Sequence, residues 1–454
     1  MVRTLASVAD AVRGELLGPD RSFGAVSTDT RQDVRGSLFV ALQGPNFDGN
    51  DYIESAAEGG AAGALVSRPA DTKLSQVAVA DTQLAFVKMA KAWRNGFSLP
   101  IIAVTGSSGK TTVKSLTTAI LSVDRKVCAT EGNLNNAIGV PITLMRLSRD
   151  DAAAVIELGA NHAGEIDFLA DMVSPTVAII TNAGAAHLEG FGSVVGVAQA
   201  KGELLDHLDA ECTAVLNADD DFFSLWRARA LGSSIISFGI DSNADVCLTG
   251  ALKFSASGSE FEIRLPDGSE IDVRLPLPGL HNVRNALAAA AATYAIGVEP
   301  QQIAAGLANV KAPSGRLTIL AGRGGSRIID DSYNANPGSV RAALDHLSLA
   351  GGTRIFVLGD MAELGADAPE MHRDIGRFAI GKCDRFIAIG ELAKVAAAAF
   401  GPGAAVADSI EQARETIVPQ LSLSTTVLVK ASRSMRLERL VQMLQQSQMD
   451  DGAC

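Results

Sequence analysis

The sequence predicts an α/β fold of three domains: a small α/β domain at the N-terminus, a central parallel sheet with an added antiparallel hairpin, and a smaller open sheet at the C-terminus. Three observations support this prediction. The chain has 454 residues, which is too many for one ordinary hydrophobic core. Apolar strand patterns alternate with helical patterns along most of the chain, as in parallel sheets covered by helices. Turn residues gather at residues 68–73 and 312–315, and we predict domains of residues 1–80, 81–312 and 313–454.

The first predicted domain mixes short strands with a helix, and the central domain carries the clearest strand signals. Five apolar segments alternate with helical patterns there: Ile101–Val104, Ala153–Ile156, Val177–Ile180, Ala214–Leu216 and Ile235–Phe238. Residues 261–265 and 271–275 alternate apolar and polar side chains on either side of a Pro-Asp-Gly turn, which predicts a hairpin. The alanine-rich segment Ala286–Ala292 predicts a buried helix.

The last part of the chain repeats the alternation of strand and helix. Strands are predicted at Arg327–Ile329, Ile355–Leu358, Phe386–Ile389 and Val427–Val429. They form a second open sheet of the Rossmann-like type, and each strand is followed by glycine or polar residues. Ligands of open parallel sheets bind at the carboxyl ends of the strands, so these ends are expected to line one side of a cleft.

Composition excludes several classes of protein. The net charge is −12 and the acidic residues are dispersed, which argues against nucleic-acid binding. No apolar run reaches the roughly 18 residues of a membrane helix, and no signal-peptide pattern opens the chain. Five widely spaced cysteines indicate neither a disulfide framework nor a zinc site. We therefore expect a cytoplasmic protein, a monomer, without stable membrane insertion.

The most specific motif is a phosphate-binding loop. The apolar strand at residues 101–104 runs into Gly106-Ser107-Ser108-Gly109-Lys110-Thr111-Thr112, and a helical pattern follows. Small residues let backbone N–H groups surround an anion, the lysine reaches terminal phosphates, and Thr111 offers a hydroxyl to magnesium. Val104 stands where the full Walker pattern has its first glycine, so the match rests on the strand–loop–helix context. ATP is the expected ligand, and a chance glycine turn is the alternative.

Two ionisable residues fall at strand ends beside this loop. Glu157 closes one predicted strand, and His187 follows another. With Thr111 they are able to hold magnesium against nucleotide phosphates. Taken singly, the histidine is more often structural, and the glutamate is more often a solvated or capping group.

The chain also resembles a known family. The segments Gly106–Thr112, Glu131–Pro141, Glu157–Asn161, Gly279–Asn285, Gly315–Leu317 and Asp330–Pro337 occur in this order. Together they are similar to the ATP-dependent muramoyl-peptide ligases of bacterial cell-wall synthesis. Residues 331–337, 358–365 and 430–435 resemble the member that joins D-alanyl-D-alanine to UDP-N-acetylmuramoyl-tripeptide, through an acyl phosphate and with magnesium.

The resemblance implies catalytic and nucleotide-binding roles. Lys110 would stabilise the transferred phosphoryl group, and the magnesium ligands would come from Thr111, Glu157, His187 and a carbamate on Lys201. Without the family, Lys201 is better explained as a solvated helix lysine. The residues implied to hold the nucleotide, beside those of the phosphate loop, are Asn282, Asn285, Arg316, Asp331 and Tyr333. Helix capping is the alternative for the two asparagines.

The resemblance also implies substrate contacts. Ser27, Thr28 and Arg31 would grip the uridine diphosphate. Asn135 and Asn136 would meet the sugar or peptide end, and Asn334, Asn336 and Ser339 would meet the dipeptide. The cluster of turn residues at 312–315 also predicts a hinge at residues 313–316, which would swing the C-terminal domain toward the central domain.

Two alternatives remain at this stage. One is a related ligase that adds a single amino acid, or glutamates to folate, against which the segment Asn334–Asn336 argues. The other is a switch-type ATPase, which would need no small-molecule acceptor.

Overall fold

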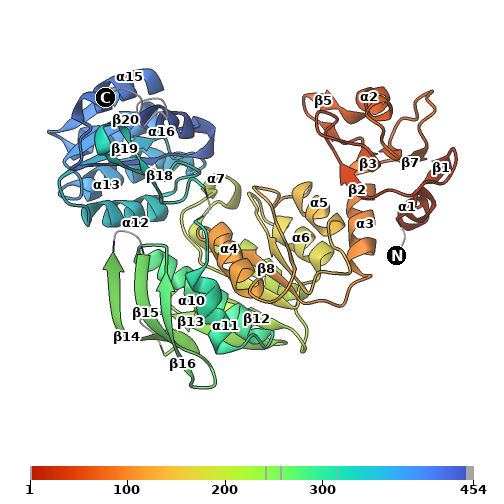
Figure 1. The fold of residues 1–454 in the computed structure, drawn as a ribbon, viewed down its shortest axis with the longest axis horizontal. Coiled ribbons are helices and arrows are strands. Elements are labelled where there is room, and N and C mark those ends of the chain that lie inside the picture. Colours follow the sequence, from red (N-terminus) through yellow and green to blue (C-terminus); the bar gives the residue numbers. More distant parts are fainter. Residues whose placement is uncertain (1–2, 241–242, 256–257, 313, 446–454) are drawn as a thin grey trace, which may run out of the picture.

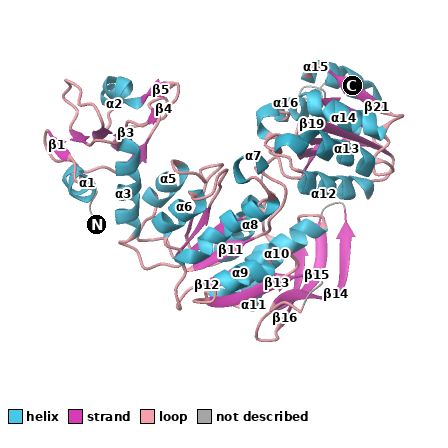
Figure 2. Cartoon of the chain, turned by 180° about the vertical axis from the view of Figure 1, so that it is seen from behind, coloured by secondary structure: helices cyan, strands magenta, loops and turns pink. Residues whose placement is uncertain are grey.

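The computed structural model describes residues 3–240, 243–255, 258–312 and 314–445. Three α/β domains follow one another along an arc, with the N-terminal and C-terminal domains at opposite ends of the central one (Figure 1). Figure 2 shows the same arrangement from behind. The predicted fold class is confirmed. The predicted boundary at 80/81 lies between β7 and α3, and the boundary at 312/313 lies between α11 and β17.

The N-terminal domain holds a five-stranded sheet of order β1-β7-β6-β3-β2. Its elements are α1 (Leu5–Val12), β1 (Glu15–Leu17), β2 (Ala25–Ser27), β3 (Ser37–Val40), β4 (Gln43–Gly44), β5 (Phe47–Asp48), η1 (Gly49–Tyr52), α2 (Ile53–Glu58), β6 (Gly63–Val66) and β7 (Gln76–Ala78). Helix α3 (Thr82–Arg94) joins this domain to the next, because its buried side chains belong to one core shared by both. Arg94 reinforces the junction by donating to the carbonyl oxygens of Val173 and Ser174.

The central domain is built on a nine-stranded sheet of order β16-β15-β14-β13-β12-β11-β8-β10-β9. Its strands are β8 (Ile101–Thr105), β9 (Val127–Ala129), β10 (Ala153–Glu157), β11 (Val177–Ile180), β12 (Thr213–Asn217), β13 (Ser234–Gly239), β14 (Val246–Ser255), β15 (Gly258–Arg264) and β16 (Glu270–Leu275). Its helices are α4 (Lys110–Leu121), α5 (Gly139–Met145), α6 (Glu165–Val173), α7 (Leu188–Phe191), α8 (Val194–Gly202), η2 (Glu203–His207), α9 (Phe223–Arg229), α10 (Leu280–Ala295) and α11 (Pro300–Ala308).

All five strands predicted for this domain are present, and so is the β15–β16 hairpin. The hairpin is part of a larger antiparallel extension, because β14 also pairs with β15 and was not predicted. Residues 286–292 are all buried within α10, as expected. Strand β8 lies between β10 and β11 in the sheet. The loops that follow these three parallel strands therefore meet at one edge of the sheet.

The C-terminal domain has a six-stranded sheet of order β17-β18-β22-β19-β20-β21. Its strands are β17 (Thr318–Ala321), β18 (Arg327–Asp331), β19 (Thr353–Gly359), β20 (Arg385–Ile389), β21 (Ala404–Ala407) and β22 (Thr425–Lys430). Its helices are η3 (Arg323–Gly325), α12 (Pro337–Ser348), η4 (Gly365–Asp367), α13 (Ala368–Ala379), α14 (Glu391–Phe400), α15 (Ile410–Ile417), η5 (Val418–Gln420), η6 (Arg433–Met435) and α16 (Glu438–Leu444). The four predicted strands are confirmed, and β17 and β21 add an edge at either side.

Two features bear on the class of protein. Among the described residues, no helix has both the length and the apolar character that crossing a bilayer requires. The four cysteines within the described ranges, Cys128, Cys212, Cys247 and Cys383, are buried free thiols. The fifth, Cys454, lies outside the described residues, as does Pro313 of the predicted hinge.

Candidate active site

The phosphate loop joins β8 to α4, and its glycines are required by their surroundings. Gly106 has φ of +146° and Gly109 has φ of +85°, in the region that favours glycine. A Cβ on Gly106 would lie 1.9 Å from Thr181 Oγ1, and one on Gly109 would lie 2.4 Å from Asn285 Oδ1. The Lys110 ammonium folds back over the loop and donates to the Gly106 carbonyl at 2.6 Å.

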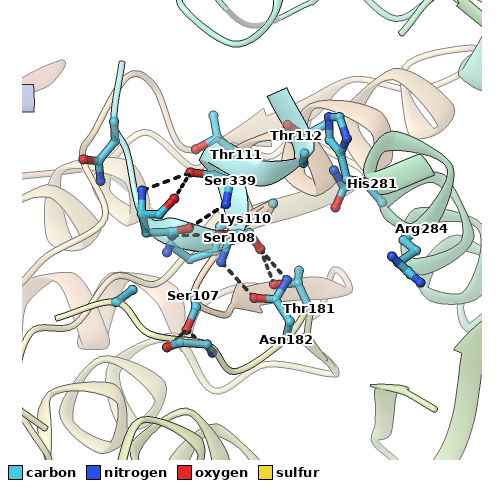
Figure 3. A pocket seen from close by; sticks show the side chains of 18 of the residues that line it. Ser107, Ser108, Lys110, Thr111, Thr112, Thr181, Asn182, His281, Arg284 and Ser339 are labelled. Atoms are coloured by element: carbon cyan, nitrogen blue, oxygen red, sulfur yellow. Dashed lines mark hydrogen bonds between the residues drawn. The ribbon is translucent and has the colours of Figure 1, made fainter. Parts of the chain in front are cut away.

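The loop after β11 supports the phosphate loop from one side. The backbone N–H groups of Ser107 and Ser108 donate to the carbonyl and side-chain oxygens of Asn182, both at 3.0 Å. Thr181 Oγ1 donates to the Ser108 carbonyl at 2.6 Å. Figure 3 shows these four residues together. Thr181 and Asn182 were not predicted as site residues, although their place at the carboxyl end of a parallel strand was a usable signal.

Glu157 supports the loop from the other side, at the end of β10. Its side chain is buried, and Oε1 accepts hydrogen bonds from Thr111 Oγ1 at 3.2 Å and from Asn135 Nδ2 at 2.9 Å. Oε2 has no hydrogen-bond partner among the described residues. The Lys114 ammonium lies 3.6 Å from Oε2, so Oε1, beside the threonine hydroxyl, is the oxygen that suits a divalent cation, which prefers oxygen ligands. The structure thus brings together two of the predicted magnesium ligands, Thr111 and Glu157.

Lys201 lies on α8 and is almost completely buried. Its ammonium donates to the Ala160 carbonyl at 3.5 Å and lies 5.2 Å from the centre of the Phe191 ring. Burial lowers the pKa of Lys201 to about 7, and the charge of Lys110 acts in the same direction. The solvated helix lysine considered as an alternative is therefore wrong. Much of this amine is neutral near pH 7, and the neutral amine is the nucleophilic form.

His187 precedes α7, with φ of +55°. Its Nδ1 lies 2.5 Å from Oε2 of Glu363, a residue of the C-terminal domain, although the two atoms do not meet in hydrogen-bond geometry. Burial lowers the pKa of His187, opposed by the Glu363 carboxylate and assisted by the lysine charges nearby. The neutral imidazole that results is the form that binds metal ions. Sequence reasoning missed Glu363.

Arg316 links the C-terminal domain to the phosphate loop. Its Nη2 donates to Thr111 Oγ1 at 3.0 Å, and its guanidinium lies 4.5 Å from the centre of the Tyr333 ring. The Tyr333 backbone N–H donates to the Gly315 carbonyl at 3.1 Å. The predicted nucleotide residues Arg316 and Tyr333 are thus stacked together beside the loop.

A buried ion pair lies at the carboxyl ends of β18 and β22. Asp331 and Lys430 are register partners in the two strands, and their side chains meet at 2.6 Å. Burial raises the pKa of Asp331, while the Lys430 ammonium opposes this shift. Lys430 Nζ also donates to the Asn334 carbonyl at 2.9 Å. Lys430 was not predicted as a site residue.

The N-terminus of α12 carries the residues predicted to meet the dipeptide. Asn336 caps this helix, because its Oδ1 accepts from the Ser339 N–H at 2.8 Å and its own N–H donates to Ser339 Oγ at 3.0 Å. Its free amide group crosses to the central domain, where Nδ2 donates to Ser108 Oγ at 2.9 Å. Asn336 is therefore both a helix cap and an interdomain contact.

These parts enclose one cavity of about 540 Å³ between the central and C-terminal domains. The predicted residues that line it are Ser107, Ser108, Gly109, Lys110, Thr111, Thr112, His187, Asn282, Asn285, Arg316, Asp331, Asn334, Asn336 and Ser339. His281, Arg284, Asp219 and Asp220 also line it and were not predicted. Burial lowers the pKa of His281 to about 4, so this ring is neutral.

The capping alternative for the two asparagines of α10 is not borne out. The residue that caps this helix is Gly279, without a side-chain bond. Asn282 Nδ2 donates to the Pro278 carbonyl at 2.8 Å, and Asn285 Nδ2 donates to Asn282 Oδ1 at 3.3 Å. Both side chains line the same cavity as the phosphate loop, and Asn285 Oδ1 lies against Gly109.

The remaining predicted residues do not line the cavity, and they are Gly106, Glu157, Lys201, Tyr333, Asn135, Asn136, Ser27, Thr28 and Arg31. Ser27, Thr28 and Arg31 lie in the N-terminal domain, where the exposed Arg31 pairs with Asp29 at 2.8 Å. Asn136 Oδ1 accepts from the N–H of Gly139 at the start of α5. Contacts of these residues with a substrate stay predictions.

Comparison with known proteins gives consistent matches over the whole chain. Family models of the Mur ligase middle domain and of the Mur ligase, glutamate ligase domain match residues 104–293 and 315–433. UDP-N-acetylmuramoyl-tripeptide–D-alanyl-D-alanine ligase of Escherichia coli (strain K12) is 44% identical over 456 residues, which covers 99% of each chain.

Solved structures agree. A crystal structure of MurF from Acinetobacter baumannii superposes with a TM-score of 0.91 at 35% identity, covering 97% of this chain and 98% of that one. MurF ligase from Thermotoga maritima in complex with ADP superposes with a TM-score of 0.81 at 26% identity, covering 92% and 96%. The chain belongs to the Mur ligase family, within its group of UDP-N-acetylmuramoyl-tripeptide–D-alanyl-D-alanine ligases.

Proposed function

We propose that this chain joins D-alanyl-D-alanine to UDP-N-acetylmuramoyl-tripeptide and converts ATP to ADP and phosphate. The terminal carboxylate of the tripeptide attacks the γ-phosphorus of ATP, and the bond to ADP breaks. The dipeptide amine then attacks the acyl carbon, phosphate leaves, and the amine loses a proton. The reaction belongs to peptidoglycan synthesis, and we place the enzyme in the cytoplasm, as a monomer.

The observation that carries this proposal is the shared cavity. A phosphate loop from the central domain and the N-terminus of α12 from the C-terminal domain face the same space. Arg316 and Asn336 tie the two domains together across it, through Thr111 and Ser108. A site of this kind holds two poorly reactive partners in an arrangement suited to attack.

The side chains have separate tasks in the proposed reaction. Lys110 and Arg316 would offset negative charge on the transferred phosphoryl group, since both carry donors beside the phosphate loop. Asn282 and Asn285 would hold the nucleoside end of ATP. Asn334, Asn336 and Ser339 would receive the dipeptide, and the N-terminal residues Ser27, Thr28 and Arg31 would hold the uridine diphosphate.

Magnesium fits the residues present. Thr111 and Glu157 offer oxygen ligands next to the phosphate loop, with His187 and a carbamate on Lys201 as further proposed ligands. Bound magnesium would neutralise phosphate charge during the transfer. Among the described residues no three His, Cys, Asp or Glu side chains form a metal cluster of their own. The proposed site therefore depends on the hydroxyl, the carbamate and the nucleotide to complete its ligands.

The test is phosphate release coupled to mass spectrometry of the product. Release should require both the UDP-linked tripeptide and D-alanyl-D-alanine, with one amide formed for each phosphate. Full-rate hydrolysis without acceptor would refute the ligase proposal. Faster product formation with a single amino acid or with glutamate would support a ligase but show that D-alanyl-D-alanine is not its acceptor. A polar amine site disfavours acceptors that leave its groups unpaired.

A further inference from the structure

Lys114 is a buried lysine on α4, and phosphate binding at the start of this helix does not explain why it is buried. It lies one helical turn after Lys110, and its residue exposure is 7%. Its Nζ donates to the Thr130 carbonyl at 2.8 Å and lies 3.6 Å from Glu157 Oε2. Lysine is almost never this buried without a partner of opposite charge. Glu157 is that partner.

The two carboxylate oxygens of Glu157 face different surroundings. Oε1 is held by the Thr111 hydroxyl and the Asn135 amide, on the side of the phosphate loop. Oε2 accepts no hydrogen bond from any described residue, and Lys114 provides an ammonium facing it. The positive charge of Lys114 therefore faces Oε2, the oxygen that receives no hydrogen bond from the phosphate-loop side.

Lys114 also ties the carboxylate to the segment after β9. Thr130 is buried, and besides accepting from Lys114 it accepts the backbone N–H of Glu157 on its own Oγ1 at 3.0 Å. Its N–H donates to the Val155 carbonyl at 3.1 Å. Lys114, Thr130 and Glu157 thus form a closed set of contacts between α4, β10 and this segment. Glu157 is held through both its backbone and its far oxygen.

We propose that Lys114 is a positioning residue for the ligase reaction, whose ammonium holds the Glu157 carboxylate in the orientation that faces Thr111 and a divalent cation bound there. The inference rests on the proposed function for the identity of the reaction, whereas the contacts that carry it involve no substrate. A buried carboxylate that loses its cation partner is strongly disfavoured and moves or repacks. Groups that orient a metal-binding side chain typically change metal affinity or activity by roughly 10- to 100-fold when removed.

The experiment uses the full chain with four substitutions. Lys114→Met removes the charge at similar length. Lys114→Gln removes the charge but keeps a donor for the Thr130 carbonyl, and it serves if the methionine variant folds poorly. Glu157→Gln is combined with Lys114→Met in a double variant. Lys126→Met is the control, because Lys126 lies 3.6 Å from Asp151 but is well exposed on the same domain.

Two measurements are made without tripeptide or dipeptide. The first is binding of a fluorescent ADP analogue at a series of magnesium concentrations. Both Lys114 variants should need roughly 10- to 100-fold more magnesium for the same binding, and the control should match the wild type. The second is the melting temperature, which should fall in Lys114→Met and recover in the double variant, because that variant no longer buries an unpaired charge.

Three results would overturn the proposal. Unchanged magnesium dependence with only a lower melting temperature would leave Lys114 with a purely structural role. Tighter magnesium binding in Lys114→Met would mean that its charge merely repels the cation. Normal magnesium binding in Lys114→Gln would show that the charge is not needed. Because nucleotide binding is measured without acceptors, these outcomes are independent of whether the wild-type chain forms the proposed amide.

Discussion

Arg316 Nη2 donates a hydrogen bond to Thr111 Oγ1 at 3.0 Å. The contact joins the C-terminal and central domains through two residues that lie 205 positions apart in the sequence. Thr111 also donates to Glu157 Oε1, so one hydroxyl connects the C-terminal domain, the phosphate loop and the proposed magnesium ligand. A cation bound to Thr111 Oγ1 would compete with Arg316 for the lone pairs of this oxygen, and the guanidinium would then be free to contact phosphate oxygens. Its stacking on Tyr333 keeps the guanidinium in place for this exchange.

Replacing Arg316 should therefore impair turnover far more than folding. An arginine that stabilises a transferred phosphoryl group contributes roughly 10³-fold or more to the rate, so Arg316→Ala should lose about that much in kcat. Arg316→Lys should recover little, because a lysine lacks the planar fork and the stacking surface. Phosphate release with both acceptors measures the effect, and Arg327→Ala, at an exposed position of β18, is the control. Turnover within threefold of wild type in Arg316→Ala would contradict this role.

Most of the strands predicted correctly are largely buried, whereas the two hairpin strands β15 and β16 were found from their alternation of apolar and polar residues. Segments such as β8 and β10 read as continuous apolar runs because helices cover both sides of a parallel sheet. Strand β14 was missed because its second half is mostly exposed and its pairing is irregular between Thr249 and Lys253. Strands β17 and β21 were missed because they are short edge strands with partly exposed residues. Without an apolar pattern, only pairing with a neighbour defines such strands, and pairing is not visible in one sequence.

The parts of the site that were predicted also differ from those that were missed in how local their pattern is. The phosphate loop was predictable because its chemistry lies in seven consecutive residues. The contacts of Glu363 with His187, of Lys430 with Asp331 and of Asn336 with Ser108 join distant segments. They depend on domain packing and strand register, which no local pattern encodes. The burial of Lys114 is likewise visible only in the fold.

Gly109→Ala should disrupt both the loop and its support. At φ of +85° an alanine is strained by roughly 1–3 kcal/mol, and its Cβ would press on the Asn285 amide. We expect the free energy of unfolding to fall by about that amount and binding of a fluorescent ADP analogue to weaken at least about tenfold, which corresponds to about 1.4 kcal/mol. Gly24→Ala, where a Cβ meets nothing within 4 Å, should leave both quantities unchanged. Normal nucleotide binding in Gly109→Ala would show that the space between Gly109 and Asn285 does not require a glycine.

Substitutions of Asn336 should separate its two roles. Asn336→Ala loses the helix cap, which costs about 1 kcal/mol of stability, and it also loses the contact with Ser108. Asn336→Ser keeps an oxygen that caps α12 but has no amide group to reach Ser108 Oγ. The serine variant should therefore melt close to wild type while its kcat falls up to roughly tenfold, the value of one hydrogen bond. Urea unfolding measures stability and phosphate release measures turnover, and equal activity of Asn336→Ser and wild type would exclude a functional interdomain contact.

Lys201 gives the clearest dependence on pH. Its pKa is about 7 in the folded chain, against an ordinary value of 10.5. Between these values the unfolded chain binds a proton that the folded chain does not, so this group makes stability rise with pH from about 7 to 10.5. Full burial of the charge below pH 7 corresponds to a penalty on the order of 5 kcal/mol. Lys201→Met, which has no charge to bury, should therefore exceed the wild type in stability by an amount that grows as the pH falls from 10.5 to 7 and then stays constant.

The measurement is urea unfolding at several pH values in buffer freed of carbon dioxide, with Lys126→Met as control. Adding bicarbonate should stabilise the wild type and not Lys201→Met, because only a neutral lysine amine forms a carbamate. Turnover of Lys201→Met should be reduced by roughly 10²-fold or more, as for other groups that stabilise charge in the transition state. A stability difference that is the same at every pH would show that Lys201 stays charged in the fold. Near-normal turnover at saturating ATP and magnesium would remove the carbamate from the proposed mechanism.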